Sequence, residues 1–327
     1  MTKVLVTGGA GYIGSHACKV LAAAGYEPVT FDNLSTGWRD AVQFGPFEQG
    51  DLCDADRISE VVRKHKPAAI MHFASLAEVG QSMQDPGLYW RTNVSGALNL
   101  LQAAADHGVP DFVFSSTCAT YGDHDGVLLD EDTPQRPINA YGASKLAIEQ
   151  MVQNFSQRYG FSYAIFRYFN VAGADASGMI GEFHDPETHL IPLAIDAATG
   201  RRPALTIFGR DYPTPDGTCV RDYVHVSDLA EAHVAGLEYL QAGNPSNVFN
   251  LGTGHGFSVQ EVVDVVANET GNNTPANDGP RRPGDCAFLV SGSRRATEIL
   301  DWSPWRSTLP QMVRDAMRWH AGKGYTS

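Results

Sequence analysis

Tyr141 and Lys145 are the two residues of this sequence whose types and spacing most directly suggest chemistry. They lie at the start of a predicted helix, with Pro137 and Asn139 just before it, and residues four apart share one helix face. A free phenol is a poor base at neutral pH, but a neighbouring ammonium group favours the phenolate. Lowering the pKa by roughly 3 units corresponds to about 4 kcal/mol, which active sites reach. The pair predicts a base, although the same spacing also describes an ordinary surface pair.

Hydroxyl side chains cluster directly after the apolar run 112–114, where a strand is expected to end. They belong to Ser115, Ser116, Thr117 and Thr120. Doubly wound parallel sheets bind ligands at the carboxyl ends of their strands. One of these hydroxyls is therefore a candidate to hydrogen-bond the reacting oxygen of a substrate, and the others are expected to satisfy backbone groups of the turn.

A glycine-rich turn behind the apolar run 4–6 would position these residues. Gly8, Gly11 and Gly14 permit a sharp turn, a close approach of the backbone to a pyrophosphate, and tight packing of the following helix. The N–H groups at the start of that helix would face the phosphates. The next strand ends at Asp32, whose carboxylate would accept a hydrogen bond from a ribose 2′-hydroxyl and repel a 2′-phosphate. The pattern predicts NAD rather than NADP as the cofactor. Its positive nicotinamide ring would act together with Lys145 to favour the phenolate of Tyr141.

Strand-like apolar runs alternate with helix-like stretches through the first half of the chain. The strands are expected over residues 4–6, 29–31, 69–73, 112–114 and 164–166, and the helices over 12–24, 58–65, 89–107 and 141–159. This alternation is typical of an α/β protein with a doubly wound parallel sheet, the NAD-binding Rossmann fold.

The alternation breaks down in the second half, where proline, glycine and charged residues accumulate. We expect a Rossmann domain over residues 1–174 and a smaller, loop-rich substrate domain over residues 175–327. The two are expected to interleave, because residues 224–255 contain a strand-like run that can return to the main sheet.

Composition excludes several classes of partner. The chain has 327 residues, 43% of them hydrophobic, which is enough for about two domains around a large core. A formal net charge of -13 would repel a polyanion, so we expect no nucleic acid partner. No apolar run approaches the roughly eighteen residues of a membrane span, and no signal peptide is expected before the strand that starts at Lys3. Five scattered cysteines fit a reducing compartment, so we expect a cytoplasmic protein.

Two further expectations concern association and metals. The helices over 89–107 and 141–159 carry apolar residues on more than one face, which suits either a large core or a second subunit, and we retain the homodimer as the prediction. His184 and His189, with Asp185 and Glu187 between them, lie in a proline-containing loop without helical i, i+4 spacing. We therefore expect no metal site.

A set of motifs spread over nearly the whole chain follows one family pattern. They are Gly8 to Gly14, Asp32-Asn33-Leu34, Gly50-Asp51-Leu52, His72-Phe73-Ala74, Ser115 to Gly122, Tyr141-x-x-x-Lys145, Arg167-Tyr168-Phe169-Asn170, Val220-Arg221-Asp222-Tyr223 and Arg281-Arg282-Pro283-Gly284-Asp285. As a set the sequence resembles the UDP-glucose 4-epimerase family of the extended short-chain dehydrogenase/reductase superfamily. The resemblance implies interconversion of UDP-galactose and UDP-glucose, by reversible hydride transfer from sugar C4 to bound NAD through a 4-keto intermediate.

Position by position, the resemblance also implies the site residues. The catalytic residues would be Thr117, Tyr141 and Lys145. The cofactor contacts would be Gly8, Gly11, Tyr12, Ile13, Gly14, Asp32, Asn33, Asp51, Leu52, Phe73, Ala74, Asn93, Ser115, Tyr141, Lys145, Tyr168 and Phe169. The UDP-sugar contacts would be Thr117, Tyr141, Asn170, His189, Leu190, Phe208, Arg221, Arg282, Asp285 and Leu289. The two arginines would hold the diphosphate.

Three positions qualify this transfer of roles. Leu289 falls where the family limits the space beside the sugar C2 substituent, so we expect UDP-GlcNAc to be a poor substrate, unless a one-residue slip of the alignment places Phe288 there instead. Ala77 stands where some relatives have a lysine near the cofactor. Gly292 stands where relatives often have an aspartate.

Three alternative functions share part of this pattern. The 4-epimerases of UDP-xylose/UDP-arabinose or of UDP-glucuronate have the same motifs and stay open. A nucleotide-sugar 4,6-dehydratase is disfavoured, because Cys118 and Ala119 occupy the place of the acidic pair that dehydration needs. A regulator that binds NAD without turnover would have little use for Tyr141 and Lys145 together with two diphosphate-binding arginines.

Overall fold

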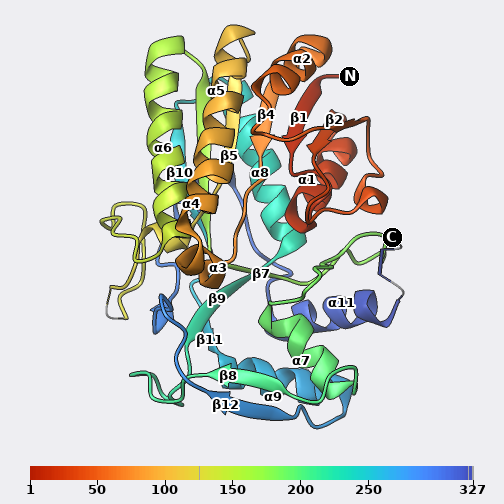
Figure 1. Cartoon of the computed structure of the whole chain (residues 1–327), viewed down its shortest axis with the longest axis vertical. Helices are drawn as coiled ribbons and strands as arrows, with labels where there is room; N and C mark the ends of the chain where they lie inside the picture. The colour runs from red at the N-terminus through yellow and green to blue at the C-terminus, as the bar shows by residue number, and fades with distance from the viewer. Residues whose placement is uncertain (125, 323, 326–327) are drawn as a thin grey trace.

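The computed structural model describes residues 1–124, 126–322 and 324–325, and a seven-stranded sheet lies at its centre (Figure 1). All pairs in this sheet are parallel, in the order β10-β6-β5-β4-β1-β2-β3. Its strands are β1 (Lys3–Thr7), β2 (Glu27–Asp32), β3 (Phe47–Gln49), β4 (Ala69–His72), β5 (Asp111–Thr117), β6 (Ser162–Tyr168) and β10 (Asn247–Leu251). The strand order reverses between β1 and β4, and such a switch point opens a ligand crevice at the carboxyl ends of the strands.

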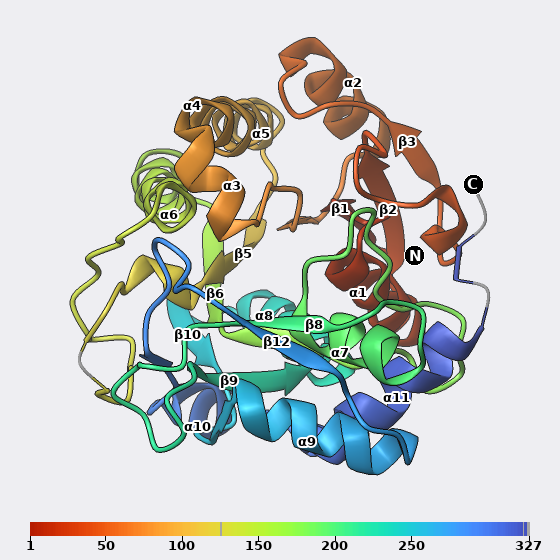
Figure 2. The same ribbon diagram turned by 60° about the horizontal axis from the view of Figure 1, so that its bottom comes forward.

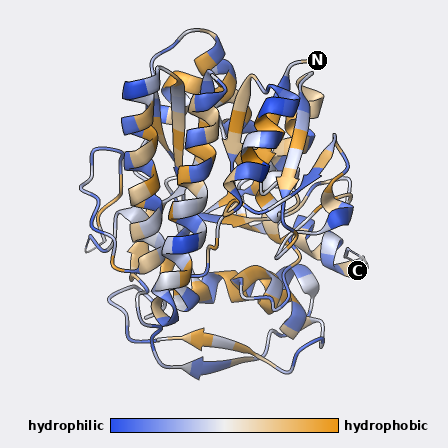
Figure 3. Cartoon of the chain, turned by 45° about the horizontal axis from the view of Figure 1, so that its top comes forward, coloured by the Kyte–Doolittle hydropathy of each residue, from blue (hydrophilic) through white to orange (hydrophobic). Residues whose placement is uncertain are grey.

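Helices cover both faces of the sheet, because alternate strand residues face opposite layers. In β1, Leu5 joins one core cluster, whereas Val4 and Val6 join the other. One layer contains α2 (Ala55–His65), α5 (Gly96–Asp106) and α6 (Ala140–Tyr159), and the other contains α1 (Tyr12–Ala23) and α8 (Val226–Gln241). The apolar colour gathers on the strands between these helices in Figure 3. The predicted doubly wound parallel sheet is confirmed.

The second half of the chain forms a smaller region beyond the carboxyl ends of the central strands (Figures 1 and 2). Its sheets comprise β11 (Gly256–Ser258), β9 (Val220–His225), β13 (Phe288–Leu289) and β7 (Asn170–Ala172), and separately β12 (Ala276–Gly279) and β8 (Leu205–Phe208). Its core packs α7 (Leu190–Ala198), α9 (Val259–Thr270) and α11 (Leu309–Ala321) together. Strands of two to six residues are too short to show a clear alternation in the sequence, so this region has more regular structure than its composition suggested.

The chain passes between the two regions more than once. β7 lies before residue 174 but pairs with β9 of the smaller region, whereas β10 lies far beyond residue 174 and pairs with β6 of the central sheet. The spatial boundary is therefore crossed several times, and the division of binding roles at residue 174 stays a prediction.

The remaining elements are short and lie between these layers. They are η1 (Arg39–Ala41), α3 (Val79–Gln84), α4 (Pro86–Tyr89), the π-helical η2 (Trp90–Ser95), η3 (Cys118–Thr120) and α10 (Arg295–Leu300). The helix expected over 89–107 is thus a succession of α4, η2 and α5. Among the described residues, no helix has the length and apolar character that crossing a bilayer requires.

Candidate active site

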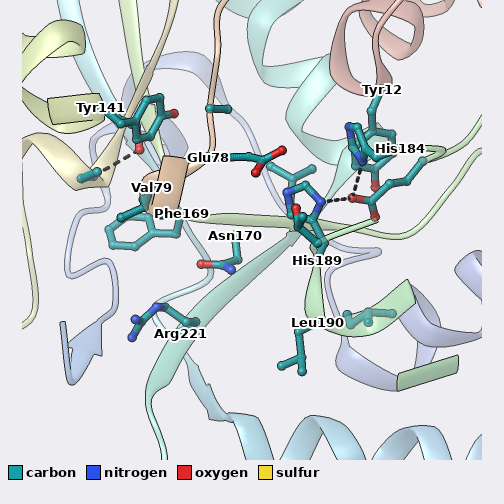
Figure 4. A pocket seen from close by; sticks show the side chains of 18 of the residues that line it. Tyr12, Glu78, Val79, Tyr141, Phe169, Asn170, His184, His189, Leu190 and Arg221 are labelled. Atoms are coloured by element: carbon teal, nitrogen blue, oxygen red, sulfur yellow. Dashed lines mark hydrogen bonds and ion pairs between the residues drawn. The ribbon is translucent and has the colours of Figure 1, made fainter. Parts of the chain in front are cut away.

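A cavity of about 610 Å³ opens between the carboxyl ends of the central strands and the smaller region. One wall comes from the β1–α1 turn, the end of β5 and the first turn of α6. The facing wall comes from residues 182–193, β8, β9 and residues 282–289. Figure 4 shows Tyr141 and Phe169 on one side of this space, with Tyr12, His184 and His189 on the other. The cavity therefore lies where a doubly wound sheet binds its ligands.

The structure brings most of the predicted site residues to this cavity. Every residue with an implied UDP-sugar contact lines it. Of the implied cofactor contacts, those in the lining are Gly8, Gly11, Tyr12, Ile13, Gly14, Asp32, Phe73, Tyr141, Tyr168 and Phe169. The remaining ones, which are not part of the lining, are Asn33, Asp51, Leu52, Ala74, Asn93, Ser115 and Lys145.

Several of the residues outside the lining hold the wall in place. The buried Asn93 amide binds the backbone of Leu76 twice, as acceptor at 2.9 Å and as donor at 3.0 Å. The Asn33 amide donates to Asp51 at 2.8 Å on an exposed edge. The Asn93 amide nitrogen also donates to the Ser144 hydroxyl at 3.2 Å. Asn93 thus fixes the loop before α3, and its predicted cofactor contact stays a prediction.

The glycine turn has the close packing that a dinucleotide site needs. Gly8 has φ +75°, and a Cβ there would lie 2.6 Å from the backbone nitrogen of Ala74. A Cβ on Gly14 would lie 2.1 Å from the carbonyl oxygen of Gly8. Helix α1 begins after Gly11, where no side chain caps it, so its first N–H groups face the cavity. This backbone cradle fits a pyrophosphate.

Asp32 lies at the end of β2 with its carboxylate at the same cavity. Its two oxygens each accept one backbone N–H, from Leu34 at 2.8 Å and from Ala10 at 3.0 Å. Burial raises the pKa of Asp32, and these two hydrogen bonds oppose that shift. Each oxygen keeps a lone pair with which a ribose hydroxyl can bind.

The hydroxyl groups at the end of β5 have two kinds of surroundings: some bond within the fold, and one faces the cavity. Ser116 donates to Glu149 at 2.5 Å, and Thr120 donates to the carbonyl of Thr117 at 2.9 Å, so both serve the fold. Thr117 lines the cavity and shares a hydrogen bond with the phenol of Tyr141. Of the cluster, Thr117 is therefore the hydroxyl placed to meet a substrate.

Tyr141 and Lys145 lie one turn apart on α6, whose N-cap Asn139 accepts from the Gly142 N–H at 2.8 Å. The Lys145 ammonium is buried and donates to the carbonyl of Ser115 at 2.8 Å. Burial lowers the pKa of Lys145 to about 7, although Glu149 opposes the shift. Lysine is therefore only partly charged near neutral pH.

Burial also has the largest effect on the pKa of Tyr141. Burial raises the pKa of Tyr141 above its ordinary value, with a further rise from Tyr168, and the hydrogen bond with Thr117 opposes both. Lys145 alone therefore does not lower this pKa, and the predicted lowering by Lys145 and the nicotinamide ring together stays a prediction. The physical reason is that both groups are removed from water, and the lysine that should stabilise the phenolate loses part of its own charge.

The facing wall supplies positive charge from distant parts of the sequence. The Arg221 side chain is 12% exposed and lies 3.7 Å from Asp285. The Arg282 guanidinium lies 4.0 Å from the centre of the Phe208 ring, a cation–π geometry that holds it at the cavity. A local pair of arginines thus offsets the acidic character of the whole chain and suits a diphosphate.

The three uncertain positions have structural explanations. Leu289 lines the cavity beside Cys118 and Phe169, whereas Phe288 is not part of the lining, so the one-residue slip does not apply. A Cβ on Gly292 would lie 2.8 Å from Leu128, and an aspartate there would displace that neighbour. Ala77, where some relatives have a lysine, lines the cavity. The next residue, Glu78, adds an acidic group to the same lining.

Sequence reasoning missed one member of a charged cluster on the facing wall. Glu182, His184, Glu187 and His189 meet there, and the His184 and His189 ring centres are 4.9 Å apart. Burial lowers the pKa of His184, but Glu182 and Glu187 outweigh it and raise that pKa to about 9. The sequence pattern groups His184, Glu187 and His189 with Asp185 and predicts no metal site there. The member that it does not identify is Glu182, which joins the histidines in place of Asp185.

Known proteins match this chain over most of its length. Residues 4–252 match the model of the NAD dependent epimerase/dehydratase family. A UDP-glucose 4-epimerase from Rhizobium leguminosarum bv. trifolii is 52% identical over 318 residues, which covers 97% of each chain.

Solved structures agree in fold as well as in sequence. The UDP-glucose 4-epimerase of Brucella ovis in complex with NAD is 46% identical, with a TM-score of 0.94 and 98% of each chain covered. The enzyme from Bifidobacterium longum in complex with NAD+ and UDP is 34% identical, with a TM-score of 0.93 and 98% of each chain covered.

Proposed function

This chain belongs to the NAD dependent epimerase/dehydratase family, and from that premise we propose how its cleft performs the reaction of a UDP-glucose 4-epimerase. The enzyme interconverts UDP-galactose and UDP-glucose and uses NAD as its cofactor. The single observation that carries the proposal is the convergence of Thr117, Tyr141, Arg221 and Arg282 on one cavity that also contains the glycine turn.

The wall of the central sheet would hold NAD through backbone and side chain together. The glycine turn and the uncapped start of α1 would bind the pyrophosphate, and Asp32 would accept from the adenosine ribose. NAD, when bound, supplies a hydride acceptor and donor for sugar C4. The protein residues around it then determine which sugar atom meets that acceptor and where the proton goes.

Tyr141 is the proposed base that removes the proton from the sugar 4-hydroxyl. Thr117 would orient the same oxygen, because its hydroxyl already bonds to the Tyr141 phenol. Since burial raises the pKa of Tyr141, the phenolate needs a positive charge beyond that of Lys145, and the oxidised nicotinamide ring brings one. Proton removal would thus be coupled to the presence of the oxidised cofactor.

Arg221 and Arg282 are the proposed anchors of the UDP diphosphate. Both line the same cavity as Tyr141, so a nucleotide bound to them would place its sugar within the cavity that contains the base. A sugar anchored through its nucleotide can turn and present its other face to the same base and cofactor. Inversion at C4 then needs no second catalytic site.

Incubation of the purified chain with UDP-galactose and no added NAD tests the function. UDP-glucose should appear, because the cofactor stays bound and is not consumed. Failure to form UDP-glucose from chain that contains bound NAD would refute the proposal. UDP-xylose, UDP-arabinose and UDP-glucuronate are then assayed at matched concentrations. If the assignment holds, each is epimerised more slowly than UDP-glucose.

We also propose that two copies associate through the α5–α6 layer. The two helices lie side by side on one flank of the molecule in Figure 1, and Trp90, Leu98 and Tyr159 there are 44%, 43% and 48% exposed. Exposed large apolar groups on adjacent helices suit a helix-to-helix interface. Sedimentation should give a dimer for the parent and a monomer for Leu98→Glu.

Location and physiological role follow from the same proposal. All five cysteines are free, which supports a reducing, cytoplasmic setting. Interconversion of UDP-galactose and UDP-glucose would place the enzyme in galactose metabolism.

A further inference from the structure

Four side chains with metal-binding atoms converge where residues 182–189 meet the start of α7. Glu182, His184, Glu187 and His189 each offer one ligand atom, and these atoms all lie within 4.8 Å of one another. Both histidines turn the same ring nitrogen, Nδ1, towards the two carboxylates. Figure 4 shows the two imidazoles next to each other on the side of the cavity away from Tyr141. The proposed epimerase reaction requires no such cluster.

The distances in the cluster are close to those between the ligands of a small cation. His189 Nδ1 lies 2.9 Å from Glu182 Oε1 and 3.1 Å from Glu187 Oε1. His184 Nδ1 lies 3.5 Å from Glu182 Oε1 and 3.6 Å from Glu187 Oε2. Tetrahedral zinc with bonds of about 2.0–2.2 Å separates its ligand atoms by about 3.3–3.6 Å. The His184 distances have this spacing, and the His189 distances would lengthen by about 0.2–0.4 Å to admit the ion.

Hydrogen bonds within the protein satisfy only part of this cluster, which includes one bond between His189 Nδ1 and Glu187 Oε1 at 3.1 Å. His184 Nδ1 is buried and has no hydrogen-bond partner, because both nearby carboxylates are too distant. Glu187 Oε1 is already occupied, since it accepts the backbone N–H groups of Thr188 and His189 at 2.8 Å each. A cation between the four groups would give His184 Nδ1 the partner that it lacks.

The donor types and charges select the class of cation. Two carboxylates with two neutral imidazoles carry a charge of -2, which a divalent ion neutralises. Neutralisation matters most for Glu182, because its side chain is only 5% exposed. Imidazole with carboxylate suits Zn²⁺ and neighbouring transition metals, whereas Mg²⁺ and Ca²⁺ prefer oxygen ligands alone. The metal would replace the protons that the imidazoles otherwise hold, because a histidine ligand must be neutral.

We propose that Glu182, His184, Glu187 and His189 bind one divalent transition-metal ion, with Zn²⁺ as the best fit. The ion would fix residues 182–189 to α7, whose N-cap is His189. It would leave His189 Nε2 available to the cavity. A second cavity of about 270 Å³ borders His184 and Glu187, which gives the ion a path that does not cross the substrate cleft.

The test is a titration of the NAD-containing protein, treated with chelator and dialysed, with Co²⁺ at pH 8.5. One Co²⁺ per chain should bind with the strong visible absorption of a four-coordinate site, and Zn²⁺ should displace it. Glu187→Gln and His184→Ala should each weaken Co²⁺ binding at least about tenfold. Glu187→Gln keeps a carbonyl oxygen for the two backbone N–H groups, so it preserves the local fold.

His107→Ala is the matched control, because His107 is exposed at the C-terminal end of α5, where it hydrogen-bonds to Ser59, and is not part of the cluster. It should bind Co²⁺ like the parent, and thermal unfolding of each variant verifies its fold. Absence of saturable Co²⁺ and Zn²⁺ binding in the parent, or equal binding by Glu187→Gln, His184→Ala and His107→Ala, would overturn the proposal. The cluster would then be two imidazolium–carboxylate pairs.

Discussion

Buried ionisable groups have opposite charge states on the two walls of the cleft. On the wall of the central sheet, burial shifts Tyr141 and Lys145 towards their neutral forms, since the lysine donates to a carbonyl rather than to a carboxylate. On the facing wall, Glu187 and His184 keep their charges when no cation is bound, because the paired groups outweigh burial. Burial neutralises an isolated group, whereas pairing preserves its charge.

The difference in charge state suits two functions, proton transfer on the first wall and ligand or loop binding on the second. A group that transfers a proton in every turnover must be able to change its charge. Lys145, with a pKa of about 7, can do so near neutral pH, whereas Tyr141, the proposed base, would need the added positive charge of the cofactor. Groups that hold an anion or a loop must keep their charge throughout. We therefore expect changes in the first wall to alter kcat and changes in the second wall to alter KM.

The largest expected effect is that of Tyr141→Phe, which removes the proposed base from the first wall. General base catalysis contributes about 10²- to 10⁴-fold, so kcat should fall at least that far, while NAD content and thermal stability stay close to those of the parent. Tyr159→Phe makes the same chemical change at an exposed position of the same helix and should keep kcat within about twofold. Activity of Tyr141→Phe within threefold of the parent would remove Tyr141 from the mechanism.

Arg282→Ala tests the second wall. Removing one charged partner of a buried ligand group costs about 2–5 kcal/mol, so KM for UDP-glucose should rise by more than about tenfold with little change in kcat. The neighbouring Arg281 is the control, because it pairs with Asp211 and is not part of the cavity lining. Equal KM values for Arg282→Ala and Arg281→Ala would show that the diphosphate binds elsewhere.

Leu289 tests the boundary between the walls. An overpacked pocket costs about 1–3 kcal/mol, so the parent should prefer UDP-glucose over UDP-GlcNAc by roughly ten- to a hundredfold in kcat/KM, and Leu289→Ser should narrow that preference. Phe288→Ser is the control, since Phe288 lies outside the cavity lining. Near-equal kcat/KM values for both sugars in the parent would show that Leu289 does not limit the pocket.

Lys145→Met should have the smallest effect, a rise of a few degrees in the Tm of the cofactor-free chain at pH 6. Because folding lowers the pKa of Lys145 to about 7, burying its charged form opposes folding most below pH 7, and this penalty fades as pH rises towards 10.5. The Tm advantage of Lys145→Met should therefore shrink between pH 6 and pH 9. An advantage that grows with pH would contradict the assigned shift.

The central-sheet wall was largely predictable from the sequence, because its residues follow strand ends and helix starts. Gly8, Asp32, Thr117 and Tyr141 all occupy such positions, where local patterns determine spatial ones. The charge state of Tyr141 was not predictable, since burial depends on distant packing.

The facing wall depends on contacts between segments far apart in the chain. Arg282 meets Phe208 across a strand pair, and Glu182 meets His189 through a folded loop, so no local spacing indicates either contact. Family resemblance identified the arginines but not the Glu182 cluster.

The fate of the C4 hydrogen during turnover tests the central claim most directly. UDP-galactose with deuterium at C4 is incubated in ordinary water with purified chain and no added NAD, and the UDP-glucose formed is analysed by mass spectrometry and NMR. The account predicts that deuterium stays at C4, because the hydride is taken up and returned within the closed cleft while only the 4-hydroxyl proton passes through Tyr141. Loss of deuterium to the solvent in step with epimerisation would contradict it.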